Sequence, residues 1–214
     1  MIYTFTGRNV SPINLNPEDI DIRDIAHALA CCNRFAGHAK FPISVAQHSV
    51  YASYLCVGTG SELQALLHDG SEAYMQDITK WVKQLPIMAG YREAEARAQK
   101  VIYRVFGCPE EDTDPVKAAD NLLVRYELMK GFGKDFTVGG VKADRHKDYP
   151  AITDHELKQM EKWYAEEWTW RMAEHRFLSR FKELTEPKPE TVETVGDWGG
   201  VWRGFYETPN TTGS

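Results

Sequence analysis

Apolar residues recur at helical spacing in several separate parts of the chain, whereas the alternating pattern of a half-buried strand is almost absent. One such series, Ile22, Ile25 and Leu29, follows an Asn16-Pro17 pair that suits the start of a helix. The pattern therefore predicts an all-α fold. Further helical patterns cover residues 44–57, 61–69, 91–106, 114–130 and 153–184.

Capping residues and helix breakers mark the ends of these predicted helices. The runs that begin at Ser61 (Ser-Glu-Leu-Gln) and Thr153 (Thr-Asp-His-Glu) each match a capping box, in which two side chains satisfy free amides of the first turn. Asp114 and Pro115 provide a cap and a proline at the first helical position. Gly107 ends the helix before them. These signals divide the chain into separate helices.

Two segments lack a helical pattern. Residues 131–150 contain four glycines and a polar run, which predicts a long loop of the kind that often forms a lid or substrate loop. From residue 185 onward Pro, Gly, Thr and Glu dominate, so we expect one domain over 1–184 and an irregular tail over 185–214. Trp198 and Trp202 in the tail have two interpretations: they pack the tail onto the body, or they dock a partner.

Composition narrows the class of protein further. The 214 residues are 43% hydrophobic and 26% charged, which is ordinary for a globular domain and excludes a wholly disordered or fibrous chain. The net charge of −6 disfavours a broad nucleic-acid or anionic-membrane surface. No stretch approaches the ~20 apolar residues of a membrane span, and the N-terminus lacks a secretion signal, so we expect a cytoplasmic protein. The four cysteines form no CxxC pair, and we interpret them as reduced.

Four residues with metal-binding side chains, His48, the adjacent His68 and Asp69, and Asp120, fall on three separate predicted helices. Two neutral imidazoles and two carboxylates suit a divalent transition ion and leave positions for water. Such an ion lowers the pKa of bound water from ~15.7 toward ~7. A single His-Asp pair is weak evidence by itself, because a lone buried histidine is more often a hydrogen-bonded core residue.

The surroundings of these residues resemble the HD-domain metal phosphohydrolases, and among them the bacterial and phage 5′-deoxynucleotidases and their dNTP-hydrolysing relatives. The segments NRFAGHAKFPISVAQHSV, ALLHDGSEAYMQDITKWVK and PVKAADNLLVRYE carry the resemblance. It implies an HD-domain helical bundle with a metal site between helices, held by His48, His68, Asp69 and Asp120. It also implies one divalent transition metal as cofactor, and Mn, Co, Zn and Fe all tolerate this ligand mix.

The same resemblance implies catalytic and substrate-binding roles. Glu72 and Asp77 match two catalytic carboxylates, and Glu72, four residues after His68, is expected on the same helix face. Arg34 matches an arginine that grips the phosphate, and Lys83 matches a lysine that lines the same pocket. Taken singly, each has an ordinary alternative: a solvated carboxylate, a turn residue, an ion-pair partner or a surface lysine. Phosphoryl transfer does require positive groups around the charged oxygens and a positioned proton acceptor.

Two residues near Arg34, Phe35 and His38, bear on which nucleotide the site would select. Phe35 stands where the bacterial deoxynucleotidases have tryptophan, and it can still pack against a sugar or base. His38 is close enough in sequence to reach a phosphate or base, with a hydrogen bond inside its own loop as the alternative. No histidine lies between His68 and Asp120, whereas the dinuclear HD phosphodiesterases and mixed-valent iron oxygenases need extra ones there. A single-metal hydrolase is therefore favoured.

The sequence thus predicts metal-dependent hydrolysis of deoxynucleoside 5′-phosphates. The favoured activity is a 5′-deoxynucleotidase that releases phosphate from dNMPs, because no extra Lys and Arg cluster is evident for three phosphates. The alternative is a dNTP triphosphohydrolase that releases tripolyphosphate, with an additional divalent ion carried in by the substrate, if Arg92, Arg125 or Lys142 converge in space. A non-catalytic nucleotide-binding module is a further alternative. By resemblance we also expect a homo-oligomer.

Overall fold

The central helix of the protein, α2 (Val45–Leu55), is buried on almost every side. Nine of its residues are buried, and they include the polar side chains of His48 and Ser49. A helix without a solvent-facing stripe must be covered by other elements all round. His48 is thereby placed inside the fold. The helices packed against α2 are α1 (Ile22–Cys31), α3 (Glu62–Leu67), α7 (Asp114–Phe132) and α9 (Trp170–Thr185).

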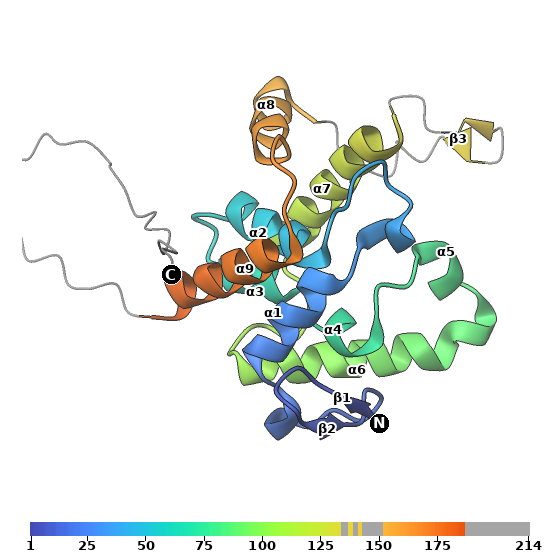
Figure 1. Cartoon of the computed structure of the whole chain (residues 1–214), viewed down its shortest axis with the longest axis vertical. Helices are drawn as coiled ribbons and strands as arrows, with labels where there is room; N and C mark the ends of the chain where they lie inside the picture. The colour runs from blue at the N-terminus through green and yellow to red at the C-terminus, as the bar shows by residue number, and fades with distance from the viewer. Residues whose placement is uncertain (134–136, 139–140, 143–151, 187–214) are drawn as a thin grey trace, which may run out of the picture.

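A computed structural model describes residues 1–133, 137–138, 141–142 and 152–186 (Figure 1). The predicted all-α fold is confirmed. In the described part of the chain, the strands form only two short antiparallel hairpins, β1–β2 and β3–β4. The other elements, in chain order, are β1 (Ile2–Tyr3), β2 (Asn9–Val10), η1 (Pro17–Asp19), η2 (Arg34–Gly37), α4 (Glu72–Met75), α5 (Lys80–Lys83), η3 (Pro86–Met88), α6 (Ala89–Val105), β3 (Thr137–Val138), β4 (Val141–Lys142) and α8 (Asp154–Trp163).

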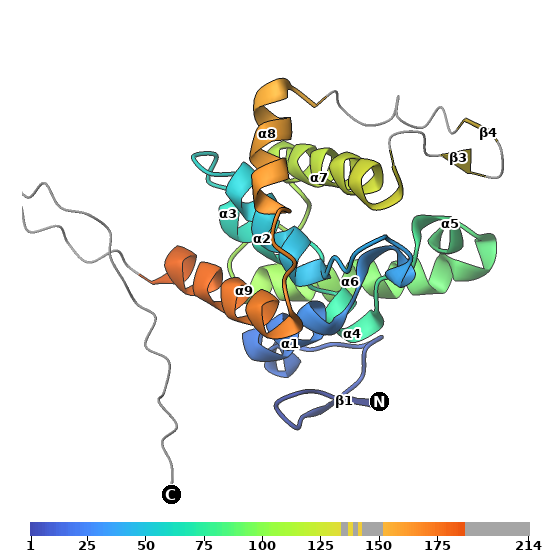
Figure 2. The ribbon, with the colours of Figure 1, turned by 45° about the horizontal axis from the view of Figure 1, so that its top comes forward.

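The core is built from helices that are far apart in the sequence. Figure 1 shows α6 near one end of the bundle and α8 at the other, with α1, α2 and α9 between them, and Figure 2 shows α8 beside α7. Ile25 and Leu29 of α1, Leu66 of α3, Ile102 of α6 and Phe177 of α9 are all completely buried. Burying an apolar side chain of this size contributes about 1.5–3 kcal/mol. The apolar positions predicted for α1 and α3 therefore do face the core.

The prediction of one long helix over 153–184 is wrong. Thr153 forms the expected capping box, but α8 ends at Trp163, and Thr169 caps a second helix, α9, by accepting from the amide of Met172. The carbonyl oxygens at the end of α8 are satisfied from outside the helix: Tyr51 donates to that of Trp163, and Lys130 donates to that of Tyr164. Such tertiary hydrogen bonds stabilise a helix end that no glycine or proline marks.

The capping box predicted at Ser61 does not form. Gln64, its expected partner, instead donates to the carbonyl oxygens of Pro109 and Glu111, each at 2.9 Å, and so ties α3 to the loop before α7. The helix itself ends at Leu67, and Glu72 begins a separate short helix, α4. The expectation that Glu72 shares a continuous helix face with His68 is therefore wrong, because a turn separates them.

The structure bears differently on the remaining expectations about the loop, the tail, the cysteines and membrane spans. The predicted tail, with Trp198 and Trp202, lies outside the described residues except at its first two positions, and so does most of the predicted 131–150 loop. All four cysteines are free. Among the described helices, none combines the length and the apolar character that crossing a membrane requires.

Candidate metal centre

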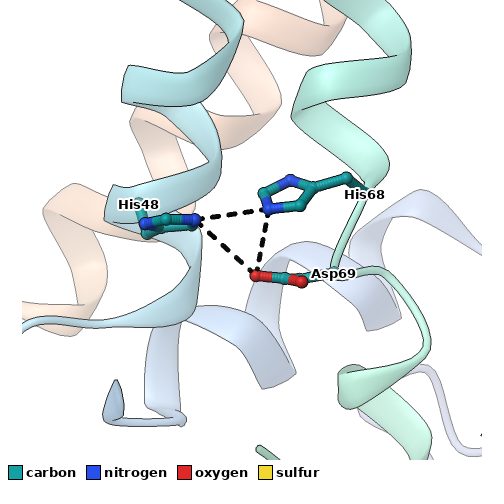
Figure 3. Close-up of side chains that lie close together, drawn as sticks. All are labelled: His48, His68 and Asp69. Atoms are coloured by element: carbon teal, nitrogen blue, oxygen red, sulfur yellow. Dashed lines mark hydrogen bonds and ion pairs between the residues drawn. The ribbon is translucent and has the colours of Figure 1, made fainter. Parts of the chain in front are cut away.

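Three helices bring the four predicted metal ligands together. His48 lies in the middle of α2, His68 and Asp69 directly follow α3, and Asp120 lies near the start of α7. Figure 3 shows the side chains of His48, His68 and Asp69 pointing toward one another. Because α3 and α7 both pack on α2, residues up to 72 positions apart in the sequence share one site.

The distances define a tight cluster. The Nε2 atoms of His48 and His68 are 3.3 Å apart. Asp69 Oδ2 lies 3.3 Å from His68 Nε2 and 3.9 Å from His48 Nε2. Asp120 Oδ1 lies 3.1 Å from His48 Nε2 and 3.8 Å from His68 Nε2. Ligand atoms of His48, His68 and Asp69 thus all lie within 4.8 Å of one another, and Asp120 Oδ1 adjoins the two histidine rings.

Hydrogen bonds on the far side of each ring indicate which nitrogens carry protons. His48 Nδ1 lies 3.0 Å from Glu127 Oε1, and His68 Nδ1 lies 2.8 Å from the carbonyl oxygen of Ala65. Both oxygens are acceptors, so Nδ1 carries the hydrogen on each ring, and a neutral ring directs the lone pair of Nε2 into the cluster. Two such lone pairs beside two carboxylates repel one another unless a cation lies among them. The donor set therefore fits a divalent transition ion.

The charges in the cluster act on one another strongly. Burial alone would lower the pKa of His68, but Asp69 and then Asp120 outweigh it and raise this pKa to about 10. Burial alone would raise the pKa of Asp120, but the neighbouring rings of His48 and then His68 hold that pKa well below its usual range. The two carboxylates thus stabilise positive charge at the ring nitrogens, which is also the charge that a metal ion supplies.

Arg34, the predicted phosphate-binding arginine, lies against this cluster. Its side chain is only 11% exposed, Nε donates to Glu127 Oε2 at 2.9 Å, and Nη1 donates to Asp69 Oδ2 at 3.3 Å. Burial opposes the charged form, but Glu127 and then Asp69 keep the pKa of Arg34 above its ordinary value. A permanent positive charge therefore adjoins the candidate metal ligands. Its contact with a phosphate stays a prediction.

The predicted residues Glu72 and Lys83 lie together in a second charged group. Lys83 Nζ donates to Glu95 Oε1 at 2.6 Å and to Glu72 Oε1 at 3.3 Å. Glu72 is buried, and among the described residues its Oε2 atom has no hydrogen-bond partner. Burial, followed by the charges of Asp69 and Asp77, raises the pKa of Glu72 well above its usual range. A carboxyl with a raised pKa near a candidate metal site suits proton transfer near neutral pH.

Asp77 follows a strained backbone position. Gln76 has φ 74° and ψ 152°, a region that glycine alone adopts readily. Its amide donates to the carbonyl of Glu72 at 2.8 Å, and its carbonyl accepts from the Tyr91 hydroxyl at 3.0 Å. These bonds hold the turn that presents Asp77. Burial raises the pKa of Asp77, while the charge of Arg34 opposes the rise. Arg34 and Asp69 therefore both act electrostatically on Asp77.

The Gln76→Gly substitution is expected to stabilise the protein. Strain at such a position costs about 1–3 kcal/mol, and glycine removes it at an entropic cost of about 0.5–1 kcal/mol. We expect the free energy of unfolding to rise by about 1 kcal/mol, which for this chain length raises Tm by about 2–4 °C. Gln84→Gly is the matched control, because Gln84 is also exposed but has φ −78°. If thermal unfolding shows that Gln76→Gly lowers Tm as much as the control does, the backbone at Gln76 is not strained in the wild-type protein.

Phe35 and His38 lie in a second strained segment, directly after Arg34. Phe35 and Ala36 have φ 57° and 51°, in the left-handed region. The half-buried Phe35 ring meets that of Phe132 edge-on, with centroids 5.5 Å apart. The His38 amide donates to the carbonyl of Phe35, and its side chain is exposed. In the described part of the chain no contact joins His38 to the metal cluster, so substrate binding by these two residues stays a prediction.

Three residues at the site were not predicted from the sequence: Glu127, Tyr164 and Glu95. Glu127 is completely buried and contacts both His48 and Arg34. One signal could have found it, since it lies seven residues after Asp120 and hence on the same face of α7. Tyr164 and Glu95 carry no comparable signal, because their contacts come from the packing of α8 and α6.

The fold and the site together thus define the class of protein: an all-α protein with a candidate metal centre of histidine and aspartate side chains. No model of a known protein family matches the chain. The chain is 40% identical over 126 residues to "Uncharacterized protein YfdR" of Escherichia coli (strain K12), which covers 59% of this chain and 69% of the relative. It is 34% identical over 143 residues to "Uncharacterized protein RCAP_rcc00048" of Rhodobacter capsulatus, which covers 60% of this chain and 72% of that relative. The chain belongs to the same family as these two proteins.

Proposed function

We propose that this chain is an HD-type, metal-dependent phosphohydrolase that acts on deoxynucleoside 5′-phosphates, with dNMPs as the favoured substrates. The observation that carries the proposal is the mutual approach of ligand atoms from His48, His68 and Asp69, with Asp120 Oδ1 beside both histidine rings. A divalent ion held there would lower the pKa of bound water from ~15.7 toward ~7 and so supply a nucleophile at neutral pH.

The residues around the cluster have the properties that hydrolysis of a phosphomonoester requires. Water attacks phosphorus, the bond between phosphorus and the sugar 5′-oxygen breaks, and that oxygen takes up a proton. Glu72 and Asp77, whose pKa values are raised by burial, would hold and deliver the protons. Arg34 and Lys83 would neutralise the charge that develops on the phosphate oxygens. Arg34 contacts Asp69 directly, Lys83 contacts Glu72, and the charge of Asp69 acts on both Glu72 and Asp77.

The available cations support a monophosphate more than a triphosphate. Arg34 and Lys83 each contact two carboxylates already. Arg92, one of the further cations that a triphosphate would need, donates to the main-chain carbonyls of Lys83 and Leu85. A dNTP triphosphohydrolase accordingly stays the alternative. We further propose a cytoplasmic location, where deoxynucleotides are metabolised, and a homo-oligomer, as the resemblance implies.

Product identification tests this proposal. Metal-stripped protein is reconstituted with Mn²⁺ or Co²⁺ and incubated with dNMPs, dNTPs and their ribose counterparts, and the products are separated by chromatography. We expect inorganic phosphate and nucleoside from dNMPs. Tripolyphosphate from a dNTP would establish the alternative activity instead. No product from any nucleotide, with metal bound, would contradict hydrolysis of nucleotides and favour a non-catalytic binding module.

A further inference from the structure

We propose that Glu127 is a positioning residue that fixes the candidate metal ligand His48 and Arg34 relative to each other; this inference rests on the proposed function. Glu127 lies on α7 with no exposed side-chain surface. Its Oε1 atom lies 3.0 Å from His48 Nδ1, and its Oε2 atom accepts from Arg34 Nε at 2.9 Å. One carboxylate therefore connects the metal cluster to the predicted phosphate-binding side chain.

The bond to His48 determines which ring nitrogen is available to a metal. A carboxylate only accepts hydrogen bonds, so it keeps the hydrogen of His48 on Nδ1. Figure 3 shows that the other ring nitrogen, Nε2, is the one directed at His68 and Asp69. A carboxylate behind a ligating histidine both orients the ring and raises its basicity as a ligand. Glu127 thus prepares His48 for a cation without being one of the four candidate ligands itself.

The bond to Arg34 fixes the plane of the guanidinium group. Arg34 is held at Nε by Glu127 and at Nη1 by Asp69. Asp69 is itself one of the predicted ligands, and Glu127 contacts another, His48. Both contacts therefore fix the position of Arg34 relative to the candidate ligands. A guanidinium that is oriented in advance loses less freedom when it binds a phosphate. Glu127 is therefore expected to affect metal binding and phosphate recognition together.

A third contact ties Glu127 to a distant part of the chain. The hydroxyl of Tyr164, the residue that directly follows α8, donates to Glu127 Oε1. Oε1 then has two donors and Oε2 has one, which satisfies a carboxylate that has no access to water. The two positive or donating neighbours, Arg34 and His48, keep the pKa of Glu127 below its usual value although burial opposes this.

Glu127→Gln tests the inference, because it keeps the shape but replaces one acceptor with a donor. If the amide oxygen faces His48 and Tyr164, the amide NH₂ faces Arg34 Nε–H, and two donors oppose each other. We expect Co²⁺ affinity, measured by titration of metal-stripped protein, to fall about 10–100-fold. We also expect a changed visible spectrum of the Co²⁺-saturated protein and a raised KM. Glu167→Gln, at an exposed position, is the matched control and should match wild type.

Tyr164→Phe provides a second variant in case Glu127→Gln does not fold. It removes a single donor and keeps the carboxylate, so we expect a smaller loss of Co²⁺ affinity, about 3–10-fold, below the range for removing the carboxylate itself. A folded Glu127→Gln protein with wild-type Co²⁺ affinity, spectrum and KM would overturn the inference. If Glu127→Gln does not fold, unchanged Co²⁺ affinity and spectrum in Tyr164→Phe would overturn it. Wild-type protein that binds no Co²⁺ would instead refute the proposed function.

Discussion

The Asp69→Asn protein is expected to lose both bound metal and turnover. Asp69 supplies Oδ2 to the cluster, 3.3 Å from His68 Nε2, and asparagine keeps the size of the side chain while removing its charge. Residues that merely support a metal ligand already affect affinity about 10–100-fold, so removing a charged ligand should cost more than about 100-fold. Metal content after dialysis and the rate of phosphate release from dNMPs measure the two effects.

The matched control for this substitution is Asp154→Asn, at an exposed position in the first turn of α8. It should retain metal and activity, which shows that a lost carboxylate as such has no effect. Circular dichroism shows whether both variants keep their helices. An Asp69→Asn protein that retains one equivalent of metal and turns over at the wild-type rate would remove Asp69 from the ligand set.

Glu72→Gln is expected to keep the metal and the fold but to lower kcat by about 10²-fold or more, the usual scale for a positioned acid or base. Glutamine can still accept from Lys83 Nζ, so the contact between α4 and α5 survives. What it cannot do is hold or deliver a proton at Oε2, the buried oxygen that has no partner among the described residues.

The measurement for Glu72 is the steady-state rate at saturating dNMP, with metal content determined on the same samples. Glu93→Gln is the control, because Glu93 is exposed on α6. A rate for Glu72→Gln within a few-fold of wild type would make Glu72 a structural partner of Lys83 and leave proton transfer to another group, with Asp77 as the next candidate.

Much of the helical architecture could be predicted from local patterns. The helices over 91–106 and 114–130 correspond to α6 and α7, because long amphipathic or well-capped segments carry their own signals. The break at Tyr164 could not be predicted, since no glycine or proline marks it. Its cause is tertiary: Tyr51 and Lys130 satisfy the carbonyl oxygens at the end of α8.

The candidate site was predictable only in part for the same reason. The four candidate metal ligands could be predicted from residue type, spacing and resemblance, and the packing of α2, α3 and α7 brings them together. Glu127 reads in the sequence as one more helical glutamate. The spacing of seven residues places it on the same face of α7 as Asp120, but its complete burial between His48 and Arg34 comes from tertiary packing.

A titration that follows metal binding and catalysis together tests most directly whether the four candidate metal ligands hold a catalytic metal ion. Metal-stripped wild-type protein is titrated with Co²⁺ while phosphate release from the four dNMPs is measured on each sample. The His48, His68, Asp69 and Asp120 cluster predicts that binding and rate rise in proportion and both level off at about one equivalent, as one four-ligand site requires. Phosphate release that is unaffected by stripping the metal, or a fully loaded protein that releases none, would rule out a metal-dependent hydrolase of dNMPs.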